Sequence, residues 1–169
     1  GEVNFWRVDA GAQTLVLASW GGVPKAVYWG LSLPMNEDLA TLAASTRNDI
    51  TGGMLDALPP LSLCPHREFQ GQPGMMIADG DGTPLQPAFV FDRAVQDGDR
   101  LQLFSCDGDM TLMHEIAAQS TGVLLLQTRL TSVRPIRVQW LAAPVLPAPQ
   151  TGEIIDVHGK WTREFHLNR

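Results

Sequence analysis

The sequence predicts an all-β protein: an antiparallel β-sandwich of two packed sheets, with one short helix and one long loop rich in proline and glycine. Three observations support this fold class. Short segments rich in apolar and β-branched residues recur along the chain, turn residues separate them, and several segments alternate between apolar and polar side chains. With 169 residues, of which 44% are hydrophobic and 18% charged, the chain suits one folded domain.

The first three predicted strands form an antiparallel meander. They are Val3–Asp9, which ends before Gly11, Thr14–Ser19, which ends at Gly21-Gly22, and Ala26–Trp29, which ends at Gly30. The next segment, 34–48, has the pattern of a short helix, because Leu39, Leu42 and Ala43 recur at helical spacing. Asn36 is the expected N-cap, and Glu37 and Asp38 suit the first turn.

The segment Thr51–Gly74 predicts a long loop. It contains Gly52-Gly53, Pro59-Pro60, Pro65 and Pro73, and proline cannot serve in a central strand. A loop of this length is usually functional or packed against a neighbour.

The strand pattern then returns and continues almost to the end of the chain. The predicted strands are Met75–Ile77, Ala88–Asp92, Arg100–Phe104, Thr111–Ala117, Gly122–Thr131, Ile136–Leu141 and Glu153–Val157. Three Asp-Gly segments predict turns: 79–82, 97–99 and 107–109, the first as a type I′ hairpin rather than a calcium loop. About ten strands result, and Pro144, Pro147 and Pro149 form a stiff connector before the last one.

The charge and the lack of visible targeting signals argue against several classes of binding partner and location. The net charge is −6 and the basic residues are scattered, which disfavours nucleic acid and an anionic membrane surface as partners. No apolar run approaches the length of a spanning helix, and no secretory signal is visible, so cytoplasmic residence is the default expectation. Because the first residue is Gly rather than Met, the natural N-terminus can have been trimmed.

Cysteine and histidine give weak signals. Cys64 and Cys106 are far apart and outside any CxxC pair, so two buried reduced thiols are the simplest interpretation, with a disulfide or a metal site as alternatives. No two of the histidines have the spacing of a helical zinc site, and we expect hydrogen-bonded or solvated side chains, no metal and no cofactor.

The five tryptophans allow two interpretations. They could form a sugar-stacking platform, or they could fill the core. We expect Trp6, Trp29 and Trp140 in the core and Trp161 at a domain interface. No GxSxG nucleophile elbow and no phosphate-binding loop occurs, while a pair of catalytic carboxylates from distant strands stays open.

Three segments carry a resemblance to a known family. Lys25–Gly30 (KAVYWG) resembles the early "hxYWG" strand and turn of bacterial α-galactosidases of glycoside hydrolase family 36. Val157–Glu164 (VHGKWTRE) is similar to that family's "GxWxRE" segment. Met54-Leu55-Asp56, followed by the proline-rich Pro59–Pro65, falls where the family has an "LD" motif and a proline-bearing loop.

The resemblance implies that residues 1–169 form one N-terminal β-sandwich domain, supersandwich-like, which precedes a (β/α)8 catalytic barrel. In the family the barrel supplies two aspartates for retaining hydrolysis of terminal α-galactosides. Neither the "KWDxNR" nucleophile motif nor the acid/base segment occurs in this sequence. Either the later strands of the family's sandwich are absent from this chain, or the domain is shorter in this subgroup.

The resemblance also suggests site residues and partners. The family's "GNxDFRxP" loop corresponds to 66–73, so His66, Arg67 and Glu68 are candidates for the rim of a substrate site, although only Pro73 matches the motif. Trp161, Arg163 and Glu164 are candidates for an interdomain contact. The expected partners are the enzyme's own barrel, its α-galactoside substrate and further copies of the chain. The alternatives are a free-standing carbohydrate-binding sandwich and a structural interaction domain.

Overall fold

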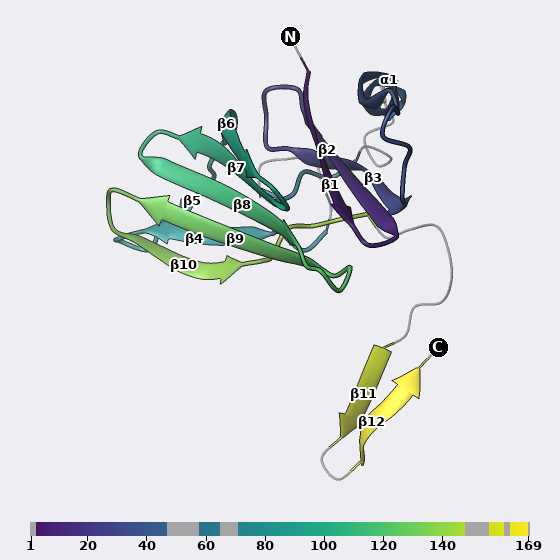
Figure 1. Ribbon diagram of the computed structural model, residues 1–169. Coiled ribbons are helices and arrows are strands. Elements are labelled where there is room, and N and C mark those ends of the chain that lie inside the picture. The colour runs from purple at the N-terminus through teal and green to yellow at the C-terminus, as the bar shows by residue number, and fades with distance from the viewer. Residues whose placement is uncertain (1–2, 47–57, 65–70, 148–155, 161–162, 169) are drawn as a thin grey trace.

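The computed structural model describes residues 3–46, 58–64, 71–147, 156–160 and 163–168 (Figure 1). This part of the chain contains twelve strands and one short helix, and the strand pairings within it are antiparallel. The predicted all-β antiparallel fold with a single short helix is therefore confirmed.

Three consecutive strands form the first sheet, sheet A. They are β1 (Asn4–Ala10), β2 (Gln13–Ser19) and β3 (Lys25–Leu31), in the order β1-β2-β3. The central strand β2 is buried almost throughout, because Leu15 and Leu17 face the main core while Val16 and Ala18 pack on the opposite side of the sheet. This explains why the sequence of β2 is a continuous apolar run instead of an alternating one.

The short helix covers that opposite side of sheet A. It is α1 (Leu39–Ser45), and its Ala43 is packed with Val16, Ala18 and Val27. The predicted cap at Asn36 is wrong, as is the placement of Asp38 in the first turn. Asp38 is itself the N-cap: its backbone is not helical, and its Oδ1 accepts a hydrogen bond from the Thr41 N–H at 3.0 Å.

Sheet B is a four-stranded meander in chain order. It contains β6 (Val90–Asp97), β7 (Arg100–Asp107), β8 (Met110–Ala118) and β9 (Leu124–Ser132). The strand predicted at Ala88–Asp92 is displaced toward the C-terminus, because β6 is defined by its pairing with β7, which runs from Val90↔Cys106 to Asp97↔Arg100. Phe89, inside the predicted range, is buried just before the strand begins.

Sheet C combines two strands that precede sheet B in the sequence with one strand that follows it. Its order is β10 (Ile136–Leu141), β4 (Met75–Asp79) and β5 (Pro84–Leu85). In Figure 1, these strands run alongside sheet B on the left of the view, and sheet A lies on the right.

The predicted turns are present, but the type I′ geometry at 79–82 is wrong. The Asp79 N–H donates to the Thr83 carbonyl, the Gly82 N–H donates to the Asp79 carbonyl, and Gly82 has a φ of 93°. This is a three-residue hairpin loop with glycine in the left-handed region. The segments 97–99 and 107–109 are two-residue loops that begin with Gly98 and Gly108, at φ values of 56° and 57°.

The last two strands form a hairpin of their own. These are β11 (Asp156–Lys160) and β12 (Arg163–Asn168), paired from Asp156↔Asn168 to Lys160↔Arg163. The strand predicted at Glu153–Val157 overlaps β11, although residues 153–155 lie outside the described part, and β12 was not predicted. The described residues contain no helix long and apolar enough to cross a membrane.

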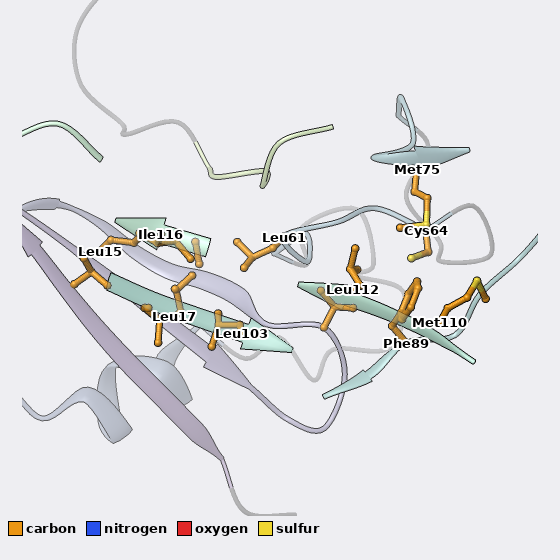
Figure 2. Packing of buried hydrophobic residues seen from close by; sticks show 14 of the residues in the cluster. Leu15, Leu17, Leu61, Cys64, Met75, Phe89, Leu103, Met110, Leu112 and Ile116 are labelled. Carbon is orange, nitrogen blue, oxygen red and sulfur yellow. The ribbon is translucent and has the colours of Figure 1, made fainter. Parts of the chain in front are cut away.

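One core joins sheets A, B and C. Sheet B supplies one side through residues such as Leu103, Leu112 and Ile116. The other side is divided between sheet A and sheet C, and Figure 2 shows Leu61 between Leu15 and Leu17 on one hand and Cys64 and Met75 on the other. The predicted second layer of the sandwich is thus made of two sheets and a connecting segment.

Candidate functional site

The connecting segment is a described part in the middle of the predicted long loop Thr51–Gly74. Leu61, Ser62, Leu63 and Cys64, named here the stem, are all 5% exposed or less. The stem is held by backbone hydrogen bonds to segments that adjoin the strands of sheets A and C. These are Leu61 N–H to Pro24 carbonyl, Val145 N–H to Leu61 carbonyl and Gly74 N–H to Leu63 carbonyl, each at 2.8 Å. The loop is therefore anchored as part of the second layer, and the chain enters residues 65–70 from a fixed position.

A polar pair ties the stem to sheet B across the core. Ser62 Oγ lies 2.7 Å from Nε2 of His114, which is in the middle of β8, and both side chains are 1% exposed or less. Burial lowers the pKa of His114 to about 3, so the ring is neutral at physiological pH. Because a substrate cannot reach either side chain, this Ser-His pair is structural and not a nucleophile with its base.

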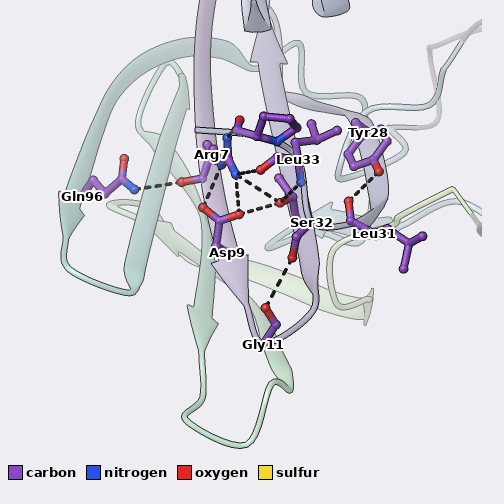
Figure 3. A network of polar contacts seen from close by, with 10 residues as sticks. Arg7, Asp9, Gly11, Tyr28, Leu31, Ser32, Leu33 and Gln96 are labelled. Atoms are coloured by element: carbon purple, nitrogen blue, oxygen red, sulfur yellow. Dashed lines mark hydrogen bonds and ion pairs between the residues drawn. The ribbon is translucent and has the colours of Figure 1, made fainter. Parts of the chain in front are cut away.

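A second polar cluster fixes the segment that leaves sheet A (Figure 3). The guanidinium of Arg7 donates Nε–H to Asp9 at 2.8 Å and also donates to the carbonyls of Leu33 and Pro34. Thr14 Oγ1 donates to the same Asp9 carboxylate. Burial alone would raise the pKa of Asp9, but the hydrogen bonds from Arg7 and Thr14 outweigh it and hold the pKa below its usual value.

Several other described carboxylates serve turns and strand surfaces. Asp79 Oδ1 accepts from two backbone N–H groups of its own hairpin, and Asp107 accepts from the Ala88 N–H. Glu115 accepts from Gln102 and Arg100, and these hydrogen bonds lower its pKa. Among the described residues, no group of three metal-ligating side chains gathers in one place.

The sequence-predicted site residues fall mostly outside the described part. His66, Arg67 and Glu68 lie there, between the stem and Gly71, and so does Trp161. Arg163 and Glu164 begin β12, and Arg163 is paired in register with Lys160 of β11. Two of the three candidate interdomain residues therefore lie at the start of β12.

Two of the three tryptophans expected in the core are there. Trp6 stacks at a tilt on Phe91, with ring centroids 5.0 Å apart, and Trp29 donates its Nε1–H to Gln13 while packing on the core. The expectation for Trp140 is wrong, because this side chain is 47% exposed. Its register partner is Met76, which points away from the core and is 40% exposed.

The two cysteines lie in different elements and differ in exposure. In the part of the chain that the structure covers, neither Cys64 nor Cys106 forms a disulfide. Cys64 is buried in the stem, whereas Cys106 is half-buried in β7, with its Sγ 3.9 Å from Thr111 Oγ1.

Sequence reasoning missed both polar ties. The Arg7–Asp9 pair has a local signal, since residues two apart in a strand share a face. The Ser62–His114 pair has none, because its members are 52 positions apart and the stem has no strand pattern.

Known proteins resemble the chain in sequence and in fold. No protein-family model matches the chain. A curated α-galactosidase of Escherichia coli is 26% identical over 154 residues, which is 85% of this chain and 21% of that protein.

Solved α-galactosidases share the fold. The enzyme from Lactobacillus brevis aligns over 98% of this chain with a TM-score of 0.74 and 14% identity, and family 36 α-galactosidase AgaB from Geobacillus stearothermophilus aligns over 100% with 0.72 and 14%. AgaA from the latter organism, solved with raffinose, gives 0.73 at 14% identity. The chain spans about a fifth of the curated relative and about a quarter of these solved chains, in their N-terminal part. The chain is thus similar in sequence to a curated α-galactosidase, and in fold to the N-terminal part of α-galactosidases of glycoside hydrolase family 36.

Proposed function

We propose that this chain is the non-catalytic N-terminal β-sandwich domain of an α-galactosidase that hydrolyses terminal α-galactosides. The observation that carries the proposal is the extent of the match: structural alignment covers 98–100% of this chain but only 27–28% of the relatives. The remaining three quarters of a relative is ample for a catalytic barrel. The proposed parent enzyme uses two barrel carboxylates and needs no cofactor.

The anchored loop suggests the role of the domain. The stem is buried in the core up to Cys64, and the Gly74 N–H donates to the Leu63 carbonyl. The chain is thus held in the fold before residue 65 and again at Gly74, which would allow His66, Arg67 and Glu68 to be presented at the rim of a substrate site. We propose this rim role for the loop.

The terminal hairpin is the proposed interdomain element. Trp161, Arg163 and Glu164 follow or belong to the turn region between β11 and β12, and they would contact the barrel. We also propose that copies of the parent enzyme contact one another and that the enzyme is located in the cytoplasm.

The test is catalytic and uses two proteins. The purified chain of residues 1–169 is incubated with a chromogenic α-galactoside, beside the product of the gene extended beyond Arg169. We expect no turnover by the chain alone and turnover by the extended product, whose added sequence should contain a "KWDxNR"-like strand. Hydrolysis by the chain alone would overturn the proposal, as would an extension without a barrel.

One observation favours a second candidate function. Trp140 is half-exposed beside Met76 on the outer side of sheet C, and apolar sugar faces pack well on indole. The chain could then bind carbohydrate by itself. Calorimetric titration with galactose and raffinose distinguishes the two: binding that is lost in Trp140→Ala supports this candidate, and absence of heat in the parent chain excludes it.

A further inference from the structure

Three side chains of sheet B form a row on the core side of its strands. The register pairs Leu103 of β7 with His114 of β8, and His114 with Thr128 of β9. Side chains directly opposite each other in an antiparallel pair have Cβ atoms about 4.5–5.5 Å apart. The imidazole of His114 and the hydroxyl of Thr128 are therefore neighbours within the sandwich.

The hydrogen bonds of this row are incomplete. Nε2 of His114 is used by Ser62, but Nδ1 has no protein hydrogen-bond partner, and neither has Thr128 Oγ1. Both atoms are buried, and the whole His114 side chain is 0% exposed. In either neutral tautomer, Nδ1 is a donor or an acceptor that needs a partner. Two neighbouring polar atoms without partners are costly in a core.

We propose that a single buried water molecule binds between Nδ1 of His114 and Oγ1 of Thr128. Water suits these atoms because it can donate to one and accept from the other, in whichever direction the tautomer requires. A metal ion does not suit them, since neither a carboxylate nor a thiolate accompanies the imidazole in this row.

The water completes a polar chain across the sandwich. It runs from Thr128 on edge strand β9, through the water and His114, to Ser62 in the stem. Each link restricts the next, because the ring of His114 is held on both nitrogens. The chain therefore helps to fix the stem in the second layer, and this consequence does not depend on the proposed α-galactosidase function.

The direct test is a crystal structure of the chain at a resolution that shows ordered water, for the parent and for Thr128→Val. Valine keeps the shape of threonine and removes the hydroxyl. We expect water density within hydrogen-bond distance of Nδ1 in the parent. A direct bond between Thr128 and His114, or the absence of water from the parent, overturns the inference.

Amide hydrogen exchange tests the consequence for the stem. The probes are the N–H groups of Leu61 and Gly74, which bond to Pro24 and Leu63. We expect about fivefold faster exchange at both in Thr128→Val, the effect of losing roughly one hydrogen bond. Thr131→Val is the matched control, because Thr131 is exposed on the other face of the same strand. Equal exchange in the two variants overturns the coupling to the stem.

Discussion

Acid should destabilise this protein through one buried side chain, His114. Its surroundings on the core side, Ser62, Leu103 and Thr128, carry no charge that could stabilise an imidazolium. The folded-state pKa is lowered from 6.5 to about 3 by burial. The unfolded chain therefore binds a proton between these values that the folded chain does not. The stabilising contribution of neutral His114 is complete above pH 6.5 and is lost progressively as the pH falls toward about 3.

The size of the effect follows from proton linkage. At about pH 5, nearly all unfolded chains carry a proton on this histidine and nearly all folded chains do not. The free energy of unfolding is then lower by about 2 kcal/mol than at about pH 7.5 on account of this group alone. That is a large fraction of the stability of an ordinary domain.

The assay is urea unfolding at both pH values for the parent and for His114→Gln. Glutamine does not titrate, and its amide can still reach Ser62. Other groups contribute equally to both proteins, so the parent should lose about 2 kcal/mol more than the variant between the two pH values. An NMR titration should show no protonation of His114 over this range. The reasoning is refuted if both proteins lose the same free energy, or if the His114 ring protonates near 6.5.

Three further substitutions test the packing and the clusters by urea unfolding at neutral pH. Arg7→Ala should lower the free energy of unfolding by about 2 kcal/mol, because it removes the hydrogen bonds to Asp9 and to two backbone carbonyls. Substitution of the exposed Arg93 in Arg93→Ala should lower it by under about 1 kcal/mol. Equal losses in the two variants would contradict this. Gly74→Ala should cost roughly 1–3 kcal/mol, since its Cβ would lie 2.8 Å from a backbone nitrogen of the stem, while Gly80→Ala meets nothing within 4 Å and should be nearly neutral. Leu112→Ala, at 0% exposure, should cost about 2–5 kcal/mol, and a smaller loss would mean that the core collapses around the cavity.

Local patterns were enough to predict most strands. Alternation identified β7 and β10, and two Asp-Gly turns correctly separated β6 from β7 and β7 from β8. The bounds of β6 were set by pairing instead: it begins at Val90 and continues along its partner β7 to Asp97, past the predicted end at Asp92. The helix cap also depended on backbone geometry, since Asp38 and Asn36 are equally suitable residues by type.

The division of the second layer could not be predicted. A stem with neighbouring prolines resembles any irregular loop, yet the backbone hydrogen bonds to Pro24 and Val145 build it into the core. Likewise, the alternating pattern of its strand predicts Trp140 in the core. The register shift between Val138 and Trp140 and the pairing with Met76 instead place the Trp140 side chain on the outer side of sheet C. These outcomes depend on contacts between distant segments, which no local pattern contains.

The placement of sheet C has a consequence for the order of folding. β10 pairs with β4, so the whole of residues 80–135, including every strand of sheet B, lies inside the loop that this pairing closes. Sheets A and B consist of neighbouring hairpins, which form early because their ends are close in the sequence. Closing β10 on β4 carries a larger entropy cost until the enclosed meander is compact. We therefore expect the last and slowest step of folding to be the docking of β10, with the meander already formed.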